Sequence, residues 1–396
     1  MPAVDSSAFP TFAAMKPWYD ARFTIGLLGG GQLGRMFIQS ALDFNASVAV
    51  LDPDPQAPCA QLGHPFEIGD WRDYDTVLGF GRDKDILTVE IEDICVPALK
   101  SLEARGVAVR PAAAVLAVIQ DKGLQKDFYR ANRFPTAPYV CVADKAGIAH
   151  LADSFFPAFQ KRRRGGYDGR GVQFLRDKSE LDRAFDVPSV IEKYIPFERE
   201  ISAIAARNAR GETAVFPVVE SHFNRAANLV ELLFSPADIS AETEREAERL
   251  AVSLAEKLEL VGILAVEFFM LPDGRLLINE MAPRPHNSGH HTLAANVTSQ
   301  YEQQLRAILN LPLGETRAYC PAAMVNLLGS ADQTGTPIYK NIESLLGEPD
   351  VHLHLYGKKE TRPYRKMGHF TVLGSDVHAV VSRAKRLRQG VTIQAI

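Results

Sequence analysis

The densest group of residues that could do chemistry lies at positions 161–171, Lys-Arg-Arg-Arg-Gly-Gly-Tyr-Asp-Gly-Arg-Gly. Four glycines fall within seven residues, and four consecutive basic residues precede them. Glycine lets successive backbone N–H groups turn toward one anion, and the basic side chains supply the opposing charge. A solvated basic hairpin tip is the alternative, but such a tip usually needs only one or two glycines. The composition therefore favours a loop that closes over the phosphates of a nucleotide.

Two glutamates, Glu267 and Glu280, interrupt apolar segments on either side of a turn signal, Pro-Asp-Gly at 272–274. The pattern predicts a β-hairpin in which the two carboxylates face each other. Crowded carboxylates in an apolar setting repel each other and lose hydration unless a cation lies between them. Magnesium prefers one or two carboxylates together with phosphate oxygens, and Asn279 adds an amide oxygen. We therefore predict a Mg²⁺ site at this pair, against the alternative of two acids on a solvated sheet face.

A proline-rich run follows the predicted hairpin and carries histidines at positions 286, 290 and 291. A histidine cluster could bind zinc, but this run gives no regular ligand geometry, and a zinc site is disfavoured. No serine or cysteine nucleophile accompanies a histidine–acid pair. The residues thus indicate activation by phosphate rather than covalent catalysis by the protein.

A second glycine motif, Gly-Gly-Gly-Gln-Leu-Gly at 29–34, follows a predicted strand at 23–28 and opens a predicted helix. Asp52 lies 18 residues beyond its last glycine, after a second strand at 47–51. By position this matches the dinucleotide fingerprint, so an NAD-dependent oxidoreductase is one alternative. A helix N-terminus also binds any other phosphorylated ligand. The acids at 90–93, after a strand at 86–90, are either ligand contacts or a solvated turn.

The elements around these motifs predict a chain of several domains. Alternating strands and helices as far as residue 120 indicate a Rossmann-like α/β unit, and the prolines at 135 and 138 mark a boundary. Strands then dominate, apart from an amphipathic helix at 241–258 whose apolar face we assign to core packing. We expect an extension at 1–23 and domains at 24–120, 121–320 and 321–396, in an α/β and α+β fold with a small β-rich C-terminal domain.

Composition excludes several classes of protein. The formal net charge is only -4, which argues against nucleic acid or an acidic membrane as the main partner. The four cysteines lie far apart without a C-x-x-C pair, as expected in a reducing cytosol. No apolar run approaches the ~18 residues of a membrane span, and the N-terminus lacks the pattern of a signal peptide. We expect a cytoplasmic protein with small-molecule substrates.

A basic segment at 358–366 lies in the predicted C-terminal domain, around Pro363. Basic segments of this kind usually lie on the protein surface, where water solvates their charges. The alternative is a second anion site on a small domain that folds over the others.

Taken together, the basic glycine loop, the paired-glutamate hairpin and the first glycine motif resemble the ATP-grasp superfamily. The sequences of four motifs are similar to those of the N5-carboxyaminoimidazole ribonucleotide synthetase family. The motifs are GGGQLGR, KRRRGGYDGRG, INEMAPRPHNSGH and RKMGH. The resemblance covers about residues 24–390 and implies an ATP-grasp architecture. It also implies ATP- and bicarbonate-dependent carboxylation of 5-aminoimidazole ribonucleotide in purine biosynthesis, with Mg²⁺ as cofactor, by a homodimer.

The resemblance also implies roles for individual residues. ATP would bind at Lys122, Lys161, Gly166, Tyr167, Asp168, Gly169, Arg170, Gly171, Glu192, Lys193, Tyr194, Ile195, Glu200, His222, Asn279 and Glu280. The aminoimidazole ribonucleotide would bind at Gln32, Leu33, Glu90, His286, Asn287, Ser288, Lys358 and Arg365. The catalytic residues would be Arg284, Tyr167, Asp168 and Arg170.

The chain departs from the family pattern in three places. Lys122 stands where an arginine is expected, Arg164 replaces a small residue, and the N-terminal extension has no counterpart.

Two rival activities remain. A formate-using glycinamide ribonucleotide transformylase shares the glutamate pair but not the Asn-Ser-Gly-His motif. An NAD-dependent activity would not explain the glutamate pair or the basic glycine loop. A protein that only binds its ligands is disfavoured, because buried carboxylate pairs without chemistry destabilise a fold.

Overall fold

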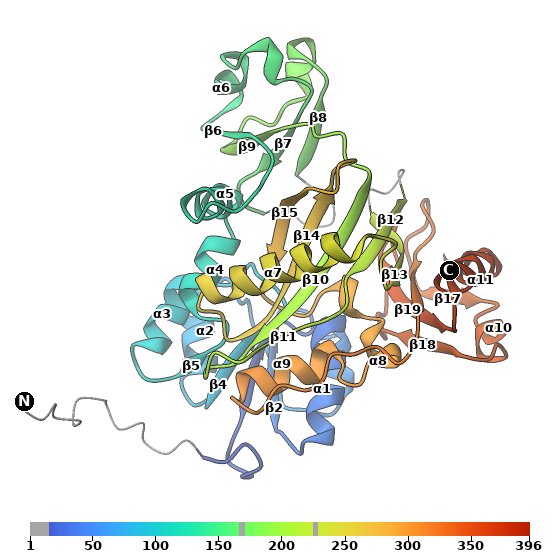
Figure 1. Ribbon diagram of the computed structural model, residues 1–396. Coiled ribbons are helices and arrows are strands. Elements are labelled where there is room, and N and C mark those ends of the chain that lie inside the picture. The colour runs from blue at the N-terminus through green and yellow to red at the C-terminus, as the bar shows by residue number, and fades with distance from the viewer. Residues whose placement is uncertain (1–15, 166–170, 225–228) are drawn as a thin grey trace, which may run out of the picture.

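The computed structural model describes residues 16–165, 171–224 and 229–396 (Figure 1). Its first unit is a parallel sheet with strand order β3-β2-β1-β4-β5. The strands are β1 (Ile25–Leu28), β2 (Val48–Asp52), β3 (Phe66–Ile68), β4 (Ile86–Val89) and β5 (Ala108–Val109). Strands β1, β2 and β4 are buried along their whole length, as expected when helices cover both faces of a parallel sheet. This confirms the predicted Rossmann-like unit.

Helices from two distant parts of the chain cover this sheet. One face packs on α1 (Gln32–Asp43) and on α9 (Gln300–Ile308), whose Tyr301, Leu305 and Ile308 are fully buried there. The other face packs on α2 (Tyr74–Gly81), α3 (Val96–Glu103) and α4 (Ala113–Ile119). Because α9 follows the paired-glutamate hairpin in sequence, its packing fixes that hairpin relative to the first glycine motif.

A four-stranded antiparallel sheet forms a second unit, at the top of Figure 1. Its order is β6-β9-β7-β8, with β6 (Tyr139–Val142), β7 (Ala158–Arg162), β8 (Val172–Leu175) and β9 (Ser189–Lys193). The basic glycine loop joins β7 to β8, and this strand–turn–strand is what the apolar residues on both sides of the loop predict. Helix α6 (Lys145–Ala149) belongs to this unit, and α5 (Lys122–Ala131) leads into it.

The largest sheet has nine strands and runs through the middle and C-terminal parts of the chain. Its order is β15-β14-β10-β12-β13-β16-β19-β18, and β11 (Thr213–Val215) pairs with β10. The strands are β10 (Arg199–Arg207), β12 (Val219–Asn224), β13 (Leu229–Ser235), β14 (Gly262–Met270), β15 (Leu276–Ala282), β16 (Ala322–Leu328), β18 (Val351–Leu355) and β19 (Lys366–Leu373). Pairing of β13 with β16 makes the C-terminal strands continuous with the glutamate hairpin.

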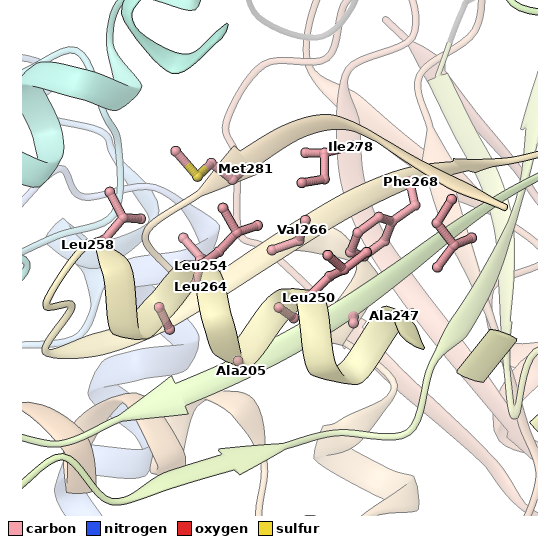
Figure 2. Close-up of a cluster of buried hydrophobic side chains, with 14 of the residues drawn as sticks. Ala205, Ala247, Leu250, Leu254, Leu258, Leu264, Val266, Phe268, Ile278 and Met281 are labelled. Carbon is pink, nitrogen blue, oxygen red and sulfur yellow. The ribbon is translucent and has the colours of Figure 1, made fainter. Parts of the chain in front are cut away.

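Helix α7 (Ala241–Lys257) lies across β10 and β14 (Figures 1 and 2). Ser240 caps its N-terminus by accepting a hydrogen bond from the backbone N–H of Thr243. Its apolar face, Ala247, Leu250, Ala251 and Leu254, is at most 2% exposed. Burial of a leucine side chain contributes about 1.5–3 kcal/mol, so this face holds the helix to the back of the hairpin that carries the glutamates. The prediction of a core-packing helix is confirmed.

Some predicted elements differ from the structure. The apolar run at 214–220 predicts one strand, but the structure has two, β11 and β12, because Pro217 between them has no N–H to donate to a ladder. The sequence pattern at 376–389 predicts a helix that closes the chain. The structure has this helix, α11 (Val377–Gly390), but β20 (Thr392–Ala395) follows it and pairs with β17 (Pro337–Lys340). Helix α9 was not expected at all, nor were the short α8 (Thr292–Ala295) and α10 (Glu343–Leu346). Within the described ranges, no helix combines the length and apolar composition needed to cross a bilayer.

Candidate active site

The two predicted metal ligands face each other in the structure. Glu267 on β14 and Glu280 on β15 are direct cross-strand partners, and their side chains are 21% and 44% exposed. Burial and the neighbouring Glu280 raise the pKa of Glu267, because two close carboxylates resist a second negative charge. Lys122 holds the pKa of Glu280 below its ordinary value. The pair presents the type of oxygen donors that a hard cation such as Mg²⁺ prefers, so these residues fit the predicted metal.

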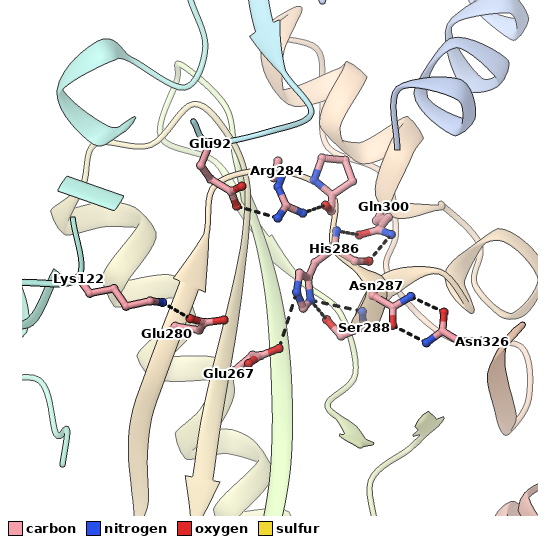
Figure 3. Close-up of polar contacts among 11 residues, drawn as sticks. Glu92, Lys122, Glu267, Glu280, Arg284, His286, Asn287, Ser288, Gln300 and Asn326 are labelled. Atoms are coloured by element: carbon pink, nitrogen blue, oxygen red, sulfur yellow. Dashed lines mark hydrogen bonds and ion pairs between the residues drawn. The ribbon is translucent and has the colours of Figure 1, made fainter. Parts of the chain in front are cut away.

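Two lysines assigned to ATP by the sequence lie beside this pair. Nζ of Lys122, at the start of α5, is 2.6 Å from Oε2 of Glu280 (Figure 3). Nζ of Lys161 on β7 is 2.9 Å from Oε2 of Glu192 on β9 and 2.9 Å from Oδ1 of Asn279 on β15. Five predicted ATP residues from four elements therefore meet where the four-stranded sheet approaches the edge of the large sheet.

By the family resemblance, residues 192–195 would bind the adenine of ATP, and this segment runs off the end of β9. The ring of Tyr194 lies 6.2 Å from that of Phe159 and 6.0 Å from that of Phe174, between ring centroids. Lys193 donates from Nζ to the carbonyl of Ser154 at 3.0 Å, and Ile195 is half-buried. The aromatic rings give this segment an apolar surface of the kind that suits a purine.

Two further ATP assignments lie on the large sheet. Burial raises the pKa of Glu200 on β10 to about 7. Nε2 of His222 on β12 lies 3.2 Å from Oε1 of Glu220, and its ring meets the Phe234 ring edge-on. Their contacts with a nucleotide stay predictions.

The basic glycine loop is described only at its two ends. Gly171 has φ +82 and accepts a hydrogen bond from the backbone N–H of Arg162 at 2.9 Å. On the other side, Nε of Arg163 lies 2.7 Å from Oδ1 of Asp121, the residue that caps α5. The remaining assignments in this loop lie outside the described residues. They are Gly166, Tyr167, Asp168, Gly169 and Arg170.

The segment after β15 holds the predicted catalytic arginine. Nη2 of Arg284 lies 2.8 Å from Oε1 of Glu92, which comes from the acidic run after β4 (Figure 3). Nδ1 of His286 lies 2.9 Å from Oγ of Ser288, and its Nε2 lies 3.7 Å from Oε1 of Glu267. Polar contacts thus join the segment after β15 both to the first unit and to the glutamate hairpin, and Glu92 is an ion-pair partner and not part of a solvated turn.

Two partners of this segment were missed by sequence reasoning. Asn287 and Asn326 exchange side-chain hydrogen bonds of 2.9 and 2.8 Å, and both are buried. Gln300, fully buried at the start of α9, accepts from the N–H of His286 and donates to its carbonyl. The amide of Asn287, assigned to the ribonucleotide, is therefore already used to tie the segment to β16. No local sequence signal could have revealed these pairs.

The first glycine motif has its backbone N–H groups occupied by the protein itself. The carboxylate of Glu90 accepts from the N–H groups of Gly31 and Gly34 at 2.5 and 2.6 Å, and Asp52 accepts from Gly30 at 2.6 Å. Glu90 thus fills the position at the start of α1 where a dinucleotide pyrophosphate would lie. This geometry disfavours the NAD alternative. Gln32 is half-buried beside it, whereas the Leu33 side chain belongs to the core, which leaves only its backbone for a ligand.

The basic segment is the connection between the antiparallel strands β18 and β19. Nζ of Lys358 donates to the carbonyl of Lys366 at 2.8 Å, and Nη1 of Arg365 donates to that of Glu360 at 2.7 Å. Gln61 of the first unit donates to the carbonyl of Gly357 at 2.7 Å. The segment therefore lies against the unit that carries the first glycine motif.

Comparisons with known proteins agree with this arrangement. Residues 22–120 match the ribonucleotide synthetase preATP-grasp domain, 127–301 the ATP-grasp domain, and 322–383 the phosphoribosylaminoimidazole carboxylase C-terminal domain. The N5-carboxyaminoimidazole ribonucleotide synthase of Synechococcus elongatus is 36% identical over 94% of this chain and 93% of its own.

Two solved structures are similar along nearly the whole chain. The N5-carboxyaminoimidazole ribonucleotide synthetase of Thermotoga maritima shares 39% identity with a TM-score of 0.87, over 94% of this chain and 100% of that one. The Aspergillus clavatus enzyme, solved with ADP and 5-aminoimidazole ribonucleotide, shares 29% identity with a TM-score of 0.84, over 94% of this chain and 98% of that one. The chain therefore belongs to the N5-carboxyaminoimidazole ribonucleotide synthase family of the ATP-grasp superfamily.

Proposed function

We propose that this protein is an ATP-dependent ligase that joins bicarbonate to the exocyclic amine of 5-aminoimidazole ribonucleotide, in purine biosynthesis. The products are the N5-carboxy compound, ADP and phosphate. The observation that carries the proposal is the facing pair Glu267 and Glu280, with Lys122 and Lys161 beside it. Two carboxylates and two ammonium groups around one space suit a bound metal–nucleotide complex.

In this mechanism, positioning and charge neutralisation do most of the work. Lys161 and Lys122 leave their carboxylate partners and hold the phosphate chain of ATP, together with the basic glycine loop. Glu267 and Glu280 would hold Mg²⁺, with Asn279 alongside, and the metal would supply positive charge against the charge that develops on the transferred phosphoryl group. Bicarbonate attacks the γ-phosphoryl group, which gives carboxyphosphate and ADP. In-line phosphoryl transfer of this kind needs no covalent intermediate on the protein.

The second half of the reaction is assigned to the region around Arg284, which contacts Glu92 of the first unit. Carboxyphosphate releases phosphate as the amine of the ribonucleotide forms a bond to its carboxyl carbon, and the phosphate takes up the proton that the amine loses. Arg284, held by Glu92, supplies positive charge for the anionic intermediate. His286 and Ser288, joined to each other at 2.9 Å, line the same segment. Because water would destroy carboxyphosphate, the basic glycine loop must close before chemistry begins.

The ribonucleotide is assigned to the region between the first glycine motif and the basic segment. Lys358 and Arg365 hold its 5′-phosphate, and Gln32, Glu90 and Asn287 lie toward its other end. The domain divisions near residues 120 and 320, a homodimeric state and a cytoplasmic location belong to the same proposal. The domain divisions are supported by the ranges that the three family models match, 22–120, 127–301 and 322–383.

A phosphate-release assay tests the function. ATP and Mg²⁺ are supplied with aminoimidazole ribonucleotide and bicarbonate together, and then with each omitted. We expect rapid release only when both are present. Release that depends on formate and glycinamide ribonucleotide instead would support the transformylase alternative and contradict this proposal.

A further inference from the structure

A third lysine, Lys126, lies behind the proposed nucleotide site and has no role in the proposed mechanism. It is on α5, one turn after Lys122, and is only 2% exposed. Its Nζ lies 3.1 Å from Oε1 of Glu192 and donates to Oγ1 of Thr136 at 2.6 Å. A lysine this deeply buried is rare without a specific partner, because an ammonium group loses its hydration on burial.

Glu192 therefore has two cations, one on each carboxylate oxygen. Lys126 contacts Oε1, and Lys161 contacts Oε2 at 2.9 Å. The side chain of Glu192 is 5% exposed and that of Lys161 is 12% exposed. Although burial opposes it, Lys161 and Lys126 together hold the pKa of Glu192 below its ordinary value. Burial, offset only in part by Glu192, lowers the pKa of Lys126 to about 8.

The two lysines differ in what else they can reach. Lys161 also contacts Asn279, beside Glu280, and so faces the place assigned to the phosphates. Lys126 instead contacts Thr136, whose hydroxyl donates to the carbonyl of Ile278 on β15 at 2.8 Å. When Lys161 turns to a phosphate, Glu192 keeps one cation, and among the described residues that cation is Lys126.

We propose that Lys126 is a positioning residue for nucleotide binding, which keeps the buried Glu192 paired so that Lys161 is free to bind the phosphates of ATP. A buried carboxylate with a single cation holds it strongly, because removal of that cation leaves an unpaired charge in a low-dielectric site. With Lys126 in place, Lys161 leaves Glu192 at a low cost in free energy. Without it, Glu192 retains Lys161 and competes with the nucleotide. This proposal rests on the ATP-dependent function proposed above.

The same ammonium group also connects the parts of the site. Lys126 is on α5, Glu192 is on β9 of the four-stranded sheet, and Thr136 bridges to β15 of the large sheet. The strand that carries the predicted adenine segment and the strand that carries Asn279 and Glu280 therefore meet at one lysine. Loss of its charge affects nucleotide binding and not the distant ribonucleotide site.

Titration calorimetry with a non-hydrolysable ATP analogue and Mg²⁺ tests the proposal. Lys126→Met should weaken binding of the analogue about tenfold or more, as expected for the loss of a charged hydrogen-bonded partner. The Michaelis constant for the aminoimidazole ribonucleotide should change less than about twofold. The matched control is Arg130→Met on the same helix, whose side chain is 72% exposed and which should bind the analogue like the unsubstituted protein.

The same substitution made in a Glu192→Gln variant distinguishes a role of the Lys126 charge from a role of its packing. In Glu192→Gln the carboxylate is gone, so adding Lys126→Met should change analogue binding less than about threefold relative to Glu192→Gln alone. This comparison also removes the buried unpaired charge that could prevent folding of the single variant. An undiminished loss in the Glu192→Gln background, or analogue binding by Lys126→Met within about twofold of the unsubstituted protein, would overturn the proposal. Absence of nucleotide binding in the unsubstituted protein would instead refute the proposed function.

Discussion

Nζ of Lys122 lies 2.6 Å from Oε2 of Glu280, one of the two carboxylates assigned to Mg²⁺. Both groups are at the edge of the space where the two sheets meet, and Lys122 is the main cause of the low pKa of Glu280. The lysine thus keeps Glu280 ionised, which is the form that binds a metal. Burial and Glu280 raise the pKa of Glu267 opposite, so the pKa values of the two carboxylates are shifted in opposite directions.

We predict that Glu280→Gln keeps the fold and loses most of the turnover. The substitution preserves shape but removes one metal-binding charge, and loss of such a contact should remove several kcal/mol of transition-state stabilisation, or roughly 10²- to 10³-fold in kcat. Steady-state kinetics at increasing Mg²⁺ measures this. Glu246→Gln, on the solvent face of α7, is the control. Near-normal turnover at saturating Mg²⁺ would exclude Glu280 as a ligand.

The first glycine motif should not bind a dinucleotide. Glu90 occupies the N–H groups of Gly31 and Gly34, and Asp52 is hydrogen-bonded to Gly30 and to the N–H of Asp54. A pyrophosphate at this place would meet two carboxylates. Calorimetric titration with NAD and NADP should show no binding, and micromolar affinity for either would revive the oxidoreductase alternative.

The same contact predicts a difference in stability between two glycine substitutions. A Cβ added at Gly31 would lie 2.4 Å from Oε1 of Glu90, whereas one added at Gly79 in α2 meets nothing within 4 Å. Gly31→Ala should therefore lower the free energy of unfolding by about 1–3 kcal/mol, and Gly79→Ala should raise it by up to about 1 kcal/mol. Chemical denaturation of both variants measures this, and equal stabilities would show that Glu90 does not crowd the motif.

Several features of the site could be predicted because they depend on local pattern. The turn at 272–274 predicts the hairpin that places Glu267 and Glu280 on adjacent strands, and the glycines after Arg164 mark the loop between two strands. The turn alone would pair Glu267 with Asn279, and it is a β-bulge between Glu267 and Phe268 that makes Glu280 the direct partner. The pairs Asn287–Asn326 and Glu90–Gly34 join residues 39 and 56 positions apart, and nothing in the local sequence specifies them. Lys126 was missed for a related reason. On an otherwise polar helix, a lysine gives no sign that tertiary packing will bury it.

Arg365→Ala tests the proposed phosphate site of the ribonucleotide. Charge-assisted hydrogen bonds contribute about 1.5–3 kcal/mol each, so the Michaelis constant for the ribonucleotide should rise roughly 10- to 100-fold while that for ATP stays almost unchanged. Lys385→Ala, exposed on α11 of the same region, is the control. An equal rise in the Michaelis constants of both substrates would indicate damaged folding or closure. No rise in either would support the alternative that this segment is only a solvated, charged surface.

Glu200 should make stability depend on pH. Its folded pKa of about 7 lies above the ordinary value of 4.5, so between these values the folded state binds the proton more tightly than the unfolded state. The stability that this group contributes is therefore present below pH 4.5 and is lost as pH rises toward 7. Relative to Glu200→Gln, the unsubstituted protein should become less stable from about pH 5 to about pH 7.5 in urea denaturation. Parallel pH profiles for the two proteins would contradict this.

In the proposed reaction, ATP activates bicarbonate before the carboxyl group reaches the amine. Brief reactions with ¹⁸O-labelled bicarbonate, ATP, Mg²⁺ and aminoimidazole ribonucleotide, followed by mass spectrometry of the released phosphate, test this most directly. Because the bicarbonate oxygen that attacks the γ-phosphoryl group leaves with it, we predict one ¹⁸O atom in each phosphate formed. Phosphate free of label, with the carboxylated product still appearing, would contradict the carboxyphosphate route.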